Sequence, residues 1–224
     1  MKMTDATQLI ESSRAVARGA LAGPGDWLSG EERLDVWREA RDSRTNSLDR
    51  ERKAALTPAM VAGAHGPSRH LSATAVDVVH RIASDPGRLS RNWASAAMSE
   101  LGEEIYTELV AVTGTAVALD SFDRAMGDEL APLPAVVSGD PSRIRPDSVG
   151  EVGAWVSQTT GEVRANVSRA VSLVPVSDAA WRQLVNAHYS RGNEFYEMNW
   201  SRALNRPQTE LVASRVTALL ECFY

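Results

Sequence analysis

The segment TELVAVTGTAVALDSF, Thr107 to Phe122, decides the fold predicted for this chain. Its apolar residues recur at intervals of three and four, which is typical of an α-helix that buries one face. The segment TELVASRVTALLECFY, Thr209 to Tyr224, lies 102 residues later and repeats the pentapeptide TELVA and much of the apolar pattern. The pair therefore predicts a helical protein with an internal duplication.

The surroundings of the two segments also correspond. Each is preceded by a similar tetrapeptide and then by a tryptophan, with RIAS at 81–84 before Trp93 and RAVS at 169–172 before Trp181. The same order of landmarks favours duplication over chance likeness between helices rich in alanine, valine and leucine. In this register Glu108 aligns with Glu210, and Asp120 stands where the second copy has Cys222.

Helical periodicity continues along most of the chain, whereas the alternating pattern of strands is scarce. Serine or asparagine precedes several of the predicted helices, as is typical of N-caps, at Ser29, Ser72, Ser177 and Asn205. The predicted helices are 4–20, 30–42, 47–64, 72–84, 89–99, 102–126, 149–154, 161–173, 177–188 and 207–220.

The sequence predicts an all-α fold made of two similar helical repeats after an N-terminal helical extension. The segment 129–150 holds four prolines, too many for a helix interior, and predicts a linker. The predicted boundaries are 1–66 for the extension, 67–128 for the first repeat, 129–150 for the linker and 151–224 for the second repeat.

Composition excludes several kinds of protein. The 24 basic and 29 acidic residues give a net charge of -5, so we expect no nucleic-acid or membrane partner. A single cysteine, with neither a signal peptide nor a membrane-spanning stretch, predicts a cytoplasmic protein. No two of the four histidines have helical ligand spacing, so we expect no metal, and His80 is interpreted as a helix-face residue.

The C-terminal segment resembles the signature of a known superfamily. ELVASRVTALLECFY, from Glu210, is similar to the motif of the carboxymuconolactone decarboxylase and AhpD-like alkylhydroperoxidase (CMD) superfamily, with a cysteine twelve residues after a glutamate. That motif continues with two residues, a second cysteine, three residues and a histidine. The segment from Val78 to Gly127 resembles the non-catalytic repeat of longer members.

The resemblance implies roles for three catalytic residues. Glu210 matches the glutamate of the proton relay, Cys222 the first cysteine, and Tyr224 a position that holds histidine or tyrosine in relatives. In the family the second cysteine attacks the peroxide and the first resolves the sulfenic acid into a disulfide. Cys222 is then the resolving thiol, and the attacking residue would directly follow Tyr224.

Three explanations of the chain end after Tyr224 stay open: a truncated sequence, a true terminus retained for a structural purpose, and a UGA codon that encodes selenocysteine. A selenol is largely ionised at neutral pH and would suit the attacking position. The codon after Tyr224 distinguishes the three. For the 224-residue chain itself we expect little or no peroxidase activity.

Peroxide reduction requires a thiolate, but an ordinary cysteine is mostly protonated at neutral pH. A nearby acid or base is therefore needed to move the proton of the thiol. Along one straight helix Glu210 and Cys222 would lie about 18 Å apart. They can cooperate only if the chain turns back after Leu220, or if another helix or subunit closes the distance.

The function that the resemblance implies is an antioxidant thiol- or selenol-dependent hydroperoxide reductase. Its substrate is a hydroperoxide, its reductant a thiol, lipoyl or thioredoxin-like dithiol, and it is a homo-oligomer. Apart from the redox-active thiol, or a selenocysteine after Tyr224, no cofactor is implied. His188 offers a substitute for the relay histidine. The alternatives are a decarboxylase that acts on a lactone and a non-catalytic helical interaction module.

Overall fold

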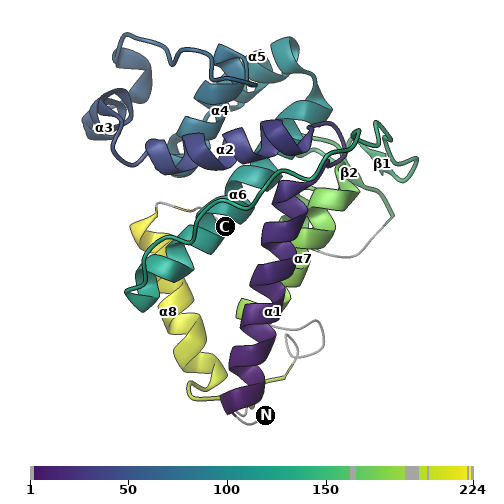
Figure 1. Cartoon of the computed structure of the whole chain (residues 1–224). Helices are drawn as coiled ribbons and strands as arrows, with labels where there is room; N and C mark the ends of the chain where they lie inside the picture. The colour runs from purple at the N-terminus through teal and green to yellow at the C-terminus, as the bar shows by residue number, and fades with distance from the viewer. Residues whose placement is uncertain (1–2, 162–164, 190–196, 201, 221, 223–224) are drawn as a thin grey trace.

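Figure 1 shows the computed structural model of the chain, which describes residues 3–161, 165–189, 197–200, 202–220 and 222. The described residues form mainly α-helices, with three short 3-10 helices and one two-stranded sheet, so the predicted all-α fold is confirmed. In chain order the elements are α1 (Met3–Ala22), α2 (Gly30–Asp42), α3 (Ser47–Ala54), η1 (Pro58–Met60), α4 (Ala73–Ser84), η2 (Pro86–Arg88), α5 (Arg91–Leu101), α6 (Glu103–Met126), β1 (Val149–Gly150), β2 (Gln158–Thr159), η3 (Asn166–Arg169), α7 (Pro175–His188) and α8 (Arg206–Leu219).

The long helix α6 lies at the centre of the molecule, with α2, α4 and α5 on one side of it and α1 and α7 on the other (Figure 1). Its buried apolar residues Leu109, Val112, Ala116 and Leu119 follow the helical period and form the middle of the core. Trp37 of α2 is fully buried against this core, and its indole N–H donates to Asp120 at 3.1 Å. The segment Thr107 to Phe122 therefore organises the fold, as its pattern predicts.

Several helix starts follow the predicted caps. The Ser29 hydroxyl accepts from the backbone N–H of Glu32, the Glu32 carboxylate accepts from the backbone N–H of Ser29, and α2 spans the predicted residues. Ser72 caps α4 in the same manner, without the reciprocal bond. Asn205 and Gln208 form a second capping box at the start of α8.

Three predicted helices differ from the structure. The helix predicted over 47–64 ends at Ala54, because Pro58 disfavours helical backbone in the residue before it and lacks an N–H. The segment 149–154 instead contains β1, which pairs antiparallel with β2. Of the segment 161–173, residues 162–164 are outside the described part, and the described remainder holds only the 3-10 helix η3 and turns.

The proline-rich segment 129–150 contains no helix and runs across the face of the molecule as an extended strap (Figure 1). Its backbone N–H groups at Val137 and Arg143 donate to the carbonyls of Ala22 and Asp26, each at 2.8 Å. The strap is thus hydrogen-bonded to the connection between α1 and α2. The predicted division into repeats stays a prediction.

Helix α7 starts at Pro175, two residues before the predicted cap Ser177. No side chain near Val174 caps it, but the buried carboxylate of Asp26 accepts from the N–H of Val176 at 3.1 Å and of Ser177 at 3.3 Å. A carboxylate from the α1–α2 connection therefore accepts hydrogen bonds from backbone N–H groups in the first turn of α7, which have no partner within the helix. Helix α7 itself packs against α1 and α6.

The two TELVA segments have opposite environments. In α6 the pentapeptide 107–111 is almost entirely buried, whereas no residue of α8 is buried.

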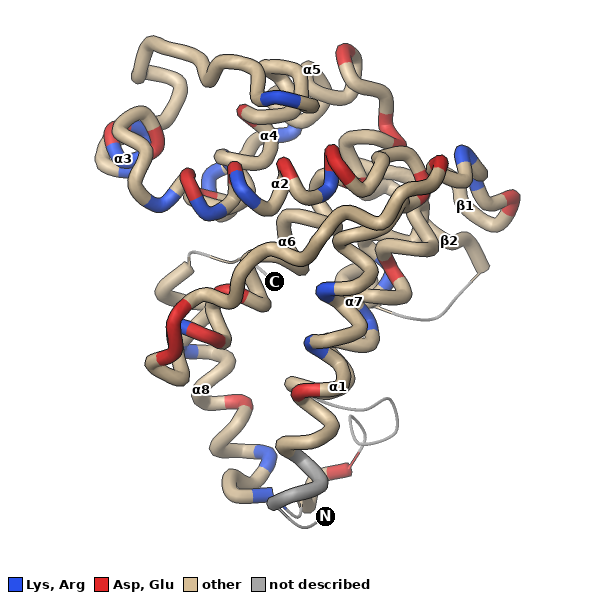
Figure 2. Tube along the Cα trace, in the orientation of Figure 1, with Lys and Arg blue, Asp and Glu red and all other residues tan. Residues whose placement is uncertain are grey.

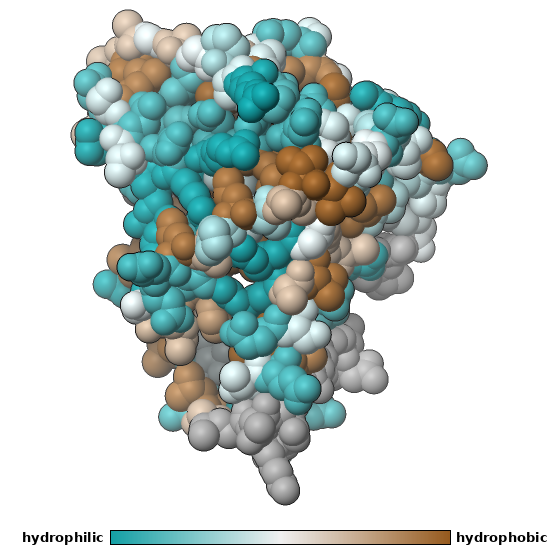
Figure 3. Space-filling model, in the orientation of Figure 1, coloured by the Kyte–Doolittle hydropathy of each residue, from teal (hydrophilic) through white to brown (hydrophobic). Residues whose placement is uncertain are grey.

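Figure 3 shows apolar surface over α8, and Figure 2 shows acidic and basic residues interleaved along α2 and α3. None of the helices that the structure describes is both long and apolar enough to cross a lipid bilayer.

Candidate functional site

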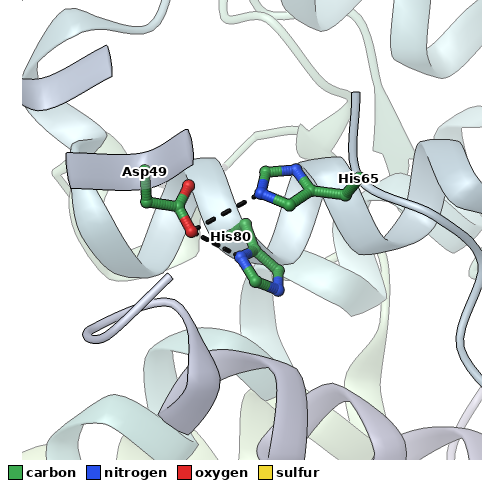
Figure 4. Close-up of side chains that lie close together, drawn as sticks. All are labelled: Asp49, His65 and His80. Atoms are coloured by element: carbon green, nitrogen blue, oxygen red, sulfur yellow. Dashed lines mark hydrogen bonds and ion pairs between the residues drawn. The ribbon is translucent and has the colours of Figure 1, made fainter. Parts of the chain in front are cut away.

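Three buried polar side chains from separate elements meet beside α2: Asp49, His65 and His80 (Figure 4). Asp49 lies in the first turn of α3, His65 in the loop after η1, and His80 in α4. One ligand atom of each lies within 4.8 Å of the other two, and the centroids of the imidazole rings are 4.0 Å apart. We call these three residues the imidazole cluster.

Both imidazoles of the cluster face one carboxylate oxygen. His80 Nδ1 lies 2.5 Å from Asp49 Oδ2, and His65 Nε2 lies 3.5 Å from the same atom. Within the described part of the chain, Asp49 Oδ1 and His65 Nε2 are buried and have no hydrogen-bond partner. Such atoms are uncommon in proteins, because losing water without gaining a partner costs about 1–3 kcal/mol.

The second nitrogen of each ring is held by an outer carboxylate. His65 Nδ1 lies 2.9 Å from Asp77 Oδ1, which also accepts from Arg52 at 2.6 Å. His80 Nε2 lies 2.9 Å from Glu39 Oε2. These contacts fix the orientation of both rings and leave the inner nitrogen of each ring directed at the carboxylate of the cluster.

The close contacts of the imidazole cluster shift the pKa values of its residues. Burial opposes the charge of His65, but the facing carboxylates of Asp49 and Asp77 outweigh it and raise the pKa of His65 to about 9. Burial likewise opposes the charge of Asp49, but the two imidazoles that face it, of His65 and His80, lower the pKa of that carboxyl to about 2. For Asp77, burial is outweighed by hydrogen bonds from His65 and Arg52, and its pKa lies well below the ordinary value.

Local sequence explains how the residues reach their places. Asn46 accepts from Leu48 N–H at 2.9 Å and caps α3, so Asp49 falls in the first turn, where the helix dipole favours a carboxylate. Gly63 has a φ of +124°, which favours glycine, and its carbonyl accepts from Arg52 at 3.0 Å. This turn returns the chain so that His65 lies over His80.

Spacing in the sequence does not indicate this cluster. His65 and His80 lie in a loop and a helix, and they meet only because α3 and its following loop fold over α4. His80 lies on a helix face of α4, as expected, and like the preceding Val78 and Val79 it is buried. A histidine on an apolar helix face is the one sign of the imidazole cluster that the sequence contains.

A second buried polar network surrounds Glu108 of α6, whose side chain is 0% exposed. The buried Arg33 guanidinium lies 2.5 Å from Glu108 Oε1. Four further groups donate to the same carboxylate, namely the backbone N–H groups of Asp26, Trp27 and Leu28 and the Ser177 hydroxyl. We call Glu108, Arg33, Asp26 and Ser177 the Glu108 cluster.

Burial governs the charges in the Glu108 cluster. Desolvation lowers the pKa of Arg33, although Glu108 counteracts it. Burial also raises the pKa of Asp26, against the hydrogen bonds that it accepts from α7. The cluster joins the α1–α2 connection, α6 and α7 in one buried interaction. It is therefore a structural junction, closed to solvent.

The residues implied by the family resemblance lie on α8 and beyond it. Glu210 accepts from the Tyr189 hydroxyl at 2.9 Å, forms an ion pair with Arg206 at 3.5 Å, and its side chain is 40% exposed. Cys222 has a free, exposed thiol. Tyr224 lies outside the described residues.

The structure does not bring Glu210 and Cys222 together. Helix α8 is continuous to Leu219, so the two residues lie at opposite ends of it. The N–H of Cys222 donates to Thr217 O at 2.9 Å. His188 packs edge-on against Phe122, with ring centroids 5.0 Å apart. No contact of His188 with Cys222 is present among the described residues.

Comparison with known proteins identifies no relative. No family model matches the chain, and neither the curated proteins nor the solved structures contain a match. The resemblance to the CMD superfamily therefore stays a prediction from the C-terminal motif and the repeated helix.

Proposed function

We propose that this chain comes from a thiol- or selenol-dependent hydroperoxide reductase of the alkylhydroperoxidase type, in which Cys222 is the resolving half of the redox couple and the 224 residues alone have little or no activity. The exposure of Cys222 is the observation that carries the proposal. Redox cysteines must reach both peroxide and reductant, whereas a structural cysteine is usually buried and inert. A reducing compartment such as the cytoplasm suits this chemistry.

In the proposed cycle Cys222 resolves the oxidised partner. A thiolate or selenolate attacks the outer oxygen of the hydroperoxide and the O–O bond breaks. The attacking residue keeps that oxygen as a sulfenic or selenenic acid, and the alkoxide leaves and takes a proton to become an alcohol. The Cys222 thiol displaces water from that acid and forms a disulfide or selenenylsulfide. A lipoyl or thioredoxin-like dithiol then reduces this bond and is itself oxidised to a disulfide.

Glu210 is the proposed proton relay, and Tyr189 and Arg206 hold its carboxylate. Because α8 separates Glu210 from Cys222, a carboxylate of one chain would serve the thiol of another. The proposed enzyme is therefore a homo-oligomer in which α8 helices from two copies lie side by side in opposite directions.

The peroxidase activity is expected to depend on a second chalcogen next to Cys222. We compare the 224-residue chain with a version that has a cysteine directly after Tyr224 and a histidine four residues beyond that cysteine. Only the extended version should reduce cumene hydroperoxide with dihydrolipoamide. Cys222→Ser in the extended version should stop turnover and leave a sulfenic acid that dimedone traps, and Glu210→Gln should slow turnover by about 100-fold.

Two controls make this test specific. In the extended version, Ser214→Cys combined with Cys222→Ser moves the resolving thiol along α8 to another exposed position and should not restore turnover. Glu100→Gln, at an exposed carboxylate of α5, should leave the rate unchanged. Cys222-dependent turnover by the 224-residue chain, or an inactive extended version, would contradict the proposal.

A second candidate function, a non-catalytic assembly module, is favoured by the exposed apolar face of α8. Leu211, Val212, Val216 and Leu219 are 71%, 55%, 47% and 64% exposed, and they follow a helical stripe on the outside of α8. Continuous apolar surface on a helix typically marks an interface. The proposed partner is a second copy of this chain.

We expect the α8 face to hold copies together. The wild-type chain should have at least the mass of a dimer in light scattering, and Leu211→Glu with Leu219→Glu should reduce it to a monomer by placing charges in the apolar contact. Leu56→Glu changes a 93% exposed leucine elsewhere and should leave the mass unchanged. A monomeric wild-type chain would remove this candidate.

A further inference from the structure

The imidazole cluster offers the donor atoms of a metal centre, and no step of the proposed thiol chemistry uses it. Two imidazole nitrogens and a carboxylate oxygen converge in a buried position. This set suits borderline divalent ions such as Zn²⁺, Co²⁺ or Fe²⁺. It differs from a surface group of acids, because all three side chains are nearly inaccessible to solvent.

The outer contacts have the form that metal-binding histidines require. A histidine ligand usually donates its other N–H to a carboxylate, which fixes the tautomer and makes the ligating nitrogen more basic. His65 does so toward Asp77 and His80 toward Glu39, each at 2.9 Å. Both rings therefore direct their ligating nitrogen at Asp49.

Charge within the group also favours a cation. The three carboxylates of Asp49, Asp77 and Glu39 and the guanidinium of Arg52 have a formal charge of -2 before the imidazoles are counted. A divalent ion held by two neutral imidazoles would balance this charge, and the ion would take the place of any proton on the inner nitrogens.

The two distances from Asp49 Oδ2 can be compared with those of a tetrahedral site. In a tetrahedral site with bonds of about 2.0–2.1 Å, neighbouring ligand atoms lie about 3.3 Å apart. His65 Nε2 is 3.5 Å from Asp49 Oδ2, close to this separation. His80 Nδ1, at 2.5 Å from the same oxygen, would have to move away by about 0.8 Å.

The unpartnered buried atoms complete the argument. His65 Nε2 belongs to the proposed ligand set, and Asp49 Oδ1 is available as a second carboxylate ligand or as an acceptor for metal-bound water. Asp77 also lines a pocket of about 160 Å³, together with Trp93 and neighbouring residues of α4 and α5.

We propose that Asp49, His65 and His80 bind one divalent transition-metal ion through Asp49 Oδ2, His65 Nε2 and His80 Nδ1. Asp77 and Glu39 position the two imidazoles. The proposal does not depend on the thiol chemistry of Cys222, and either can fail without the other.

Metal binding is tested on the full chain after treatment with EDTA. Calorimetric titration with Zn²⁺ should give one ion per chain, and Co²⁺ should produce the visible absorption of a four- or five-coordinate site. His65→Gln and His80→Gln should abolish this binding. Asp77→Asn, which alters only an outer partner, should weaken it by about 10- to 100-fold.

His70→Gln is the matched control. His70 also lies between two carboxylates, 3.0 Å from Asp35 and 3.5 Å from Glu31, but it is more exposed and outside the cluster. Its replacement should leave the stoichiometry and affinity unchanged. No Zn²⁺ uptake by the wild-type chain, or equal uptake by the His65 and His80 variants, would overturn the proposal.

If the cluster variants do not fold, ¹⁵N-labelled histidine in the wild-type chain supplies the measurement. Zn²⁺ should shift the side-chain nitrogen resonances of His65 and His80 and leave those of His70 in place. Unshifted resonances of the imidazolium type would mean that Asp49 holds two protonated rings and no metal, which would also overturn the proposal.

Discussion

Glu108→Gln is expected to lower the free energy of unfolding by about 3–5 kcal/mol, because it leaves the Arg33 charge buried without its counter-charge. Both side chains are 0% exposed, so water cannot replace the lost interaction. The glutamine NH₂ group also faces a backbone donor in either orientation, the N–H of Asp26 in one and the N–H groups of Trp27 and Leu28 in the other. Urea unfolding should show a lower midpoint with an unchanged slope.

Glu100→Gln is the control for the loss of one carboxylate. Glu100 is exposed on α5, and its one described hydrogen bond is with Thr74, at 2.6 Å. Its replacement should change stability by no more than about 0.5 kcal/mol. If both variants unfolded at the same denaturant concentration, the Glu108 cluster would not be the junction that we describe.

Gly25→Ala is expected to lower the free energy of unfolding by about 3 kcal/mol, through overpacking and displacement of the buried pair. A Cβ at Gly25 would lie 1.7 Å from Arg33 Nη1 and 1.8 Å from Glu108 Oε1. Neither group can move without losing the other. Thermal unfolding followed by circular dichroism measures the effect.

Gly19→Ala provides the same substitution where there is space. Gly19 lies in the interior of α1, and nothing is within 4 Å of a Cβ built on it. Alanine should therefore stabilise the chain by about 0.5–1 kcal/mol, because glycine has the poorer helix propensity. Changes of the same sign at both positions would contradict the close approach around Gly25.

Short-range chemistry accounts for the parts of the fold that could be predicted. The periodicity of Thr107 to Phe122 predicts the central helix, and Ser29, Ser72 and Asn205 mark helix starts because each cap depends on residues within one turn. Helix α7 departs from this rule. Its cap is Asp26, which no local pattern connects to Pro175.

Whether a predicted helix is buried or exposed could not be predicted in the same way. The pentapeptide TELVA is buried in α6 and exposed in α8, because burial depends on which helices pack alongside and not on the pentapeptide. The imidazole cluster was missed for a related reason, since its residues are brought together by tertiary packing. The roles of Glu210 and Cys222 stay predictions of the family resemblance.

The capping of α7 by Asp26 has a consequence for how the chain folds. The hydrogen bond joins residues 150 positions apart, so the start of α7 is completed only after a very long loop has closed. Closing such a loop costs conformational entropy, and distant contacts of this kind slow folding. Because synthesis runs from the N-terminus, α1, α2, α4 and α6 emerge from the ribosome first, with Asp26 still hydrated. Docking of α7 is therefore a late step, and until it occurs the Asp26 carboxylate cannot accept the hydrogen bonds from the start of α7.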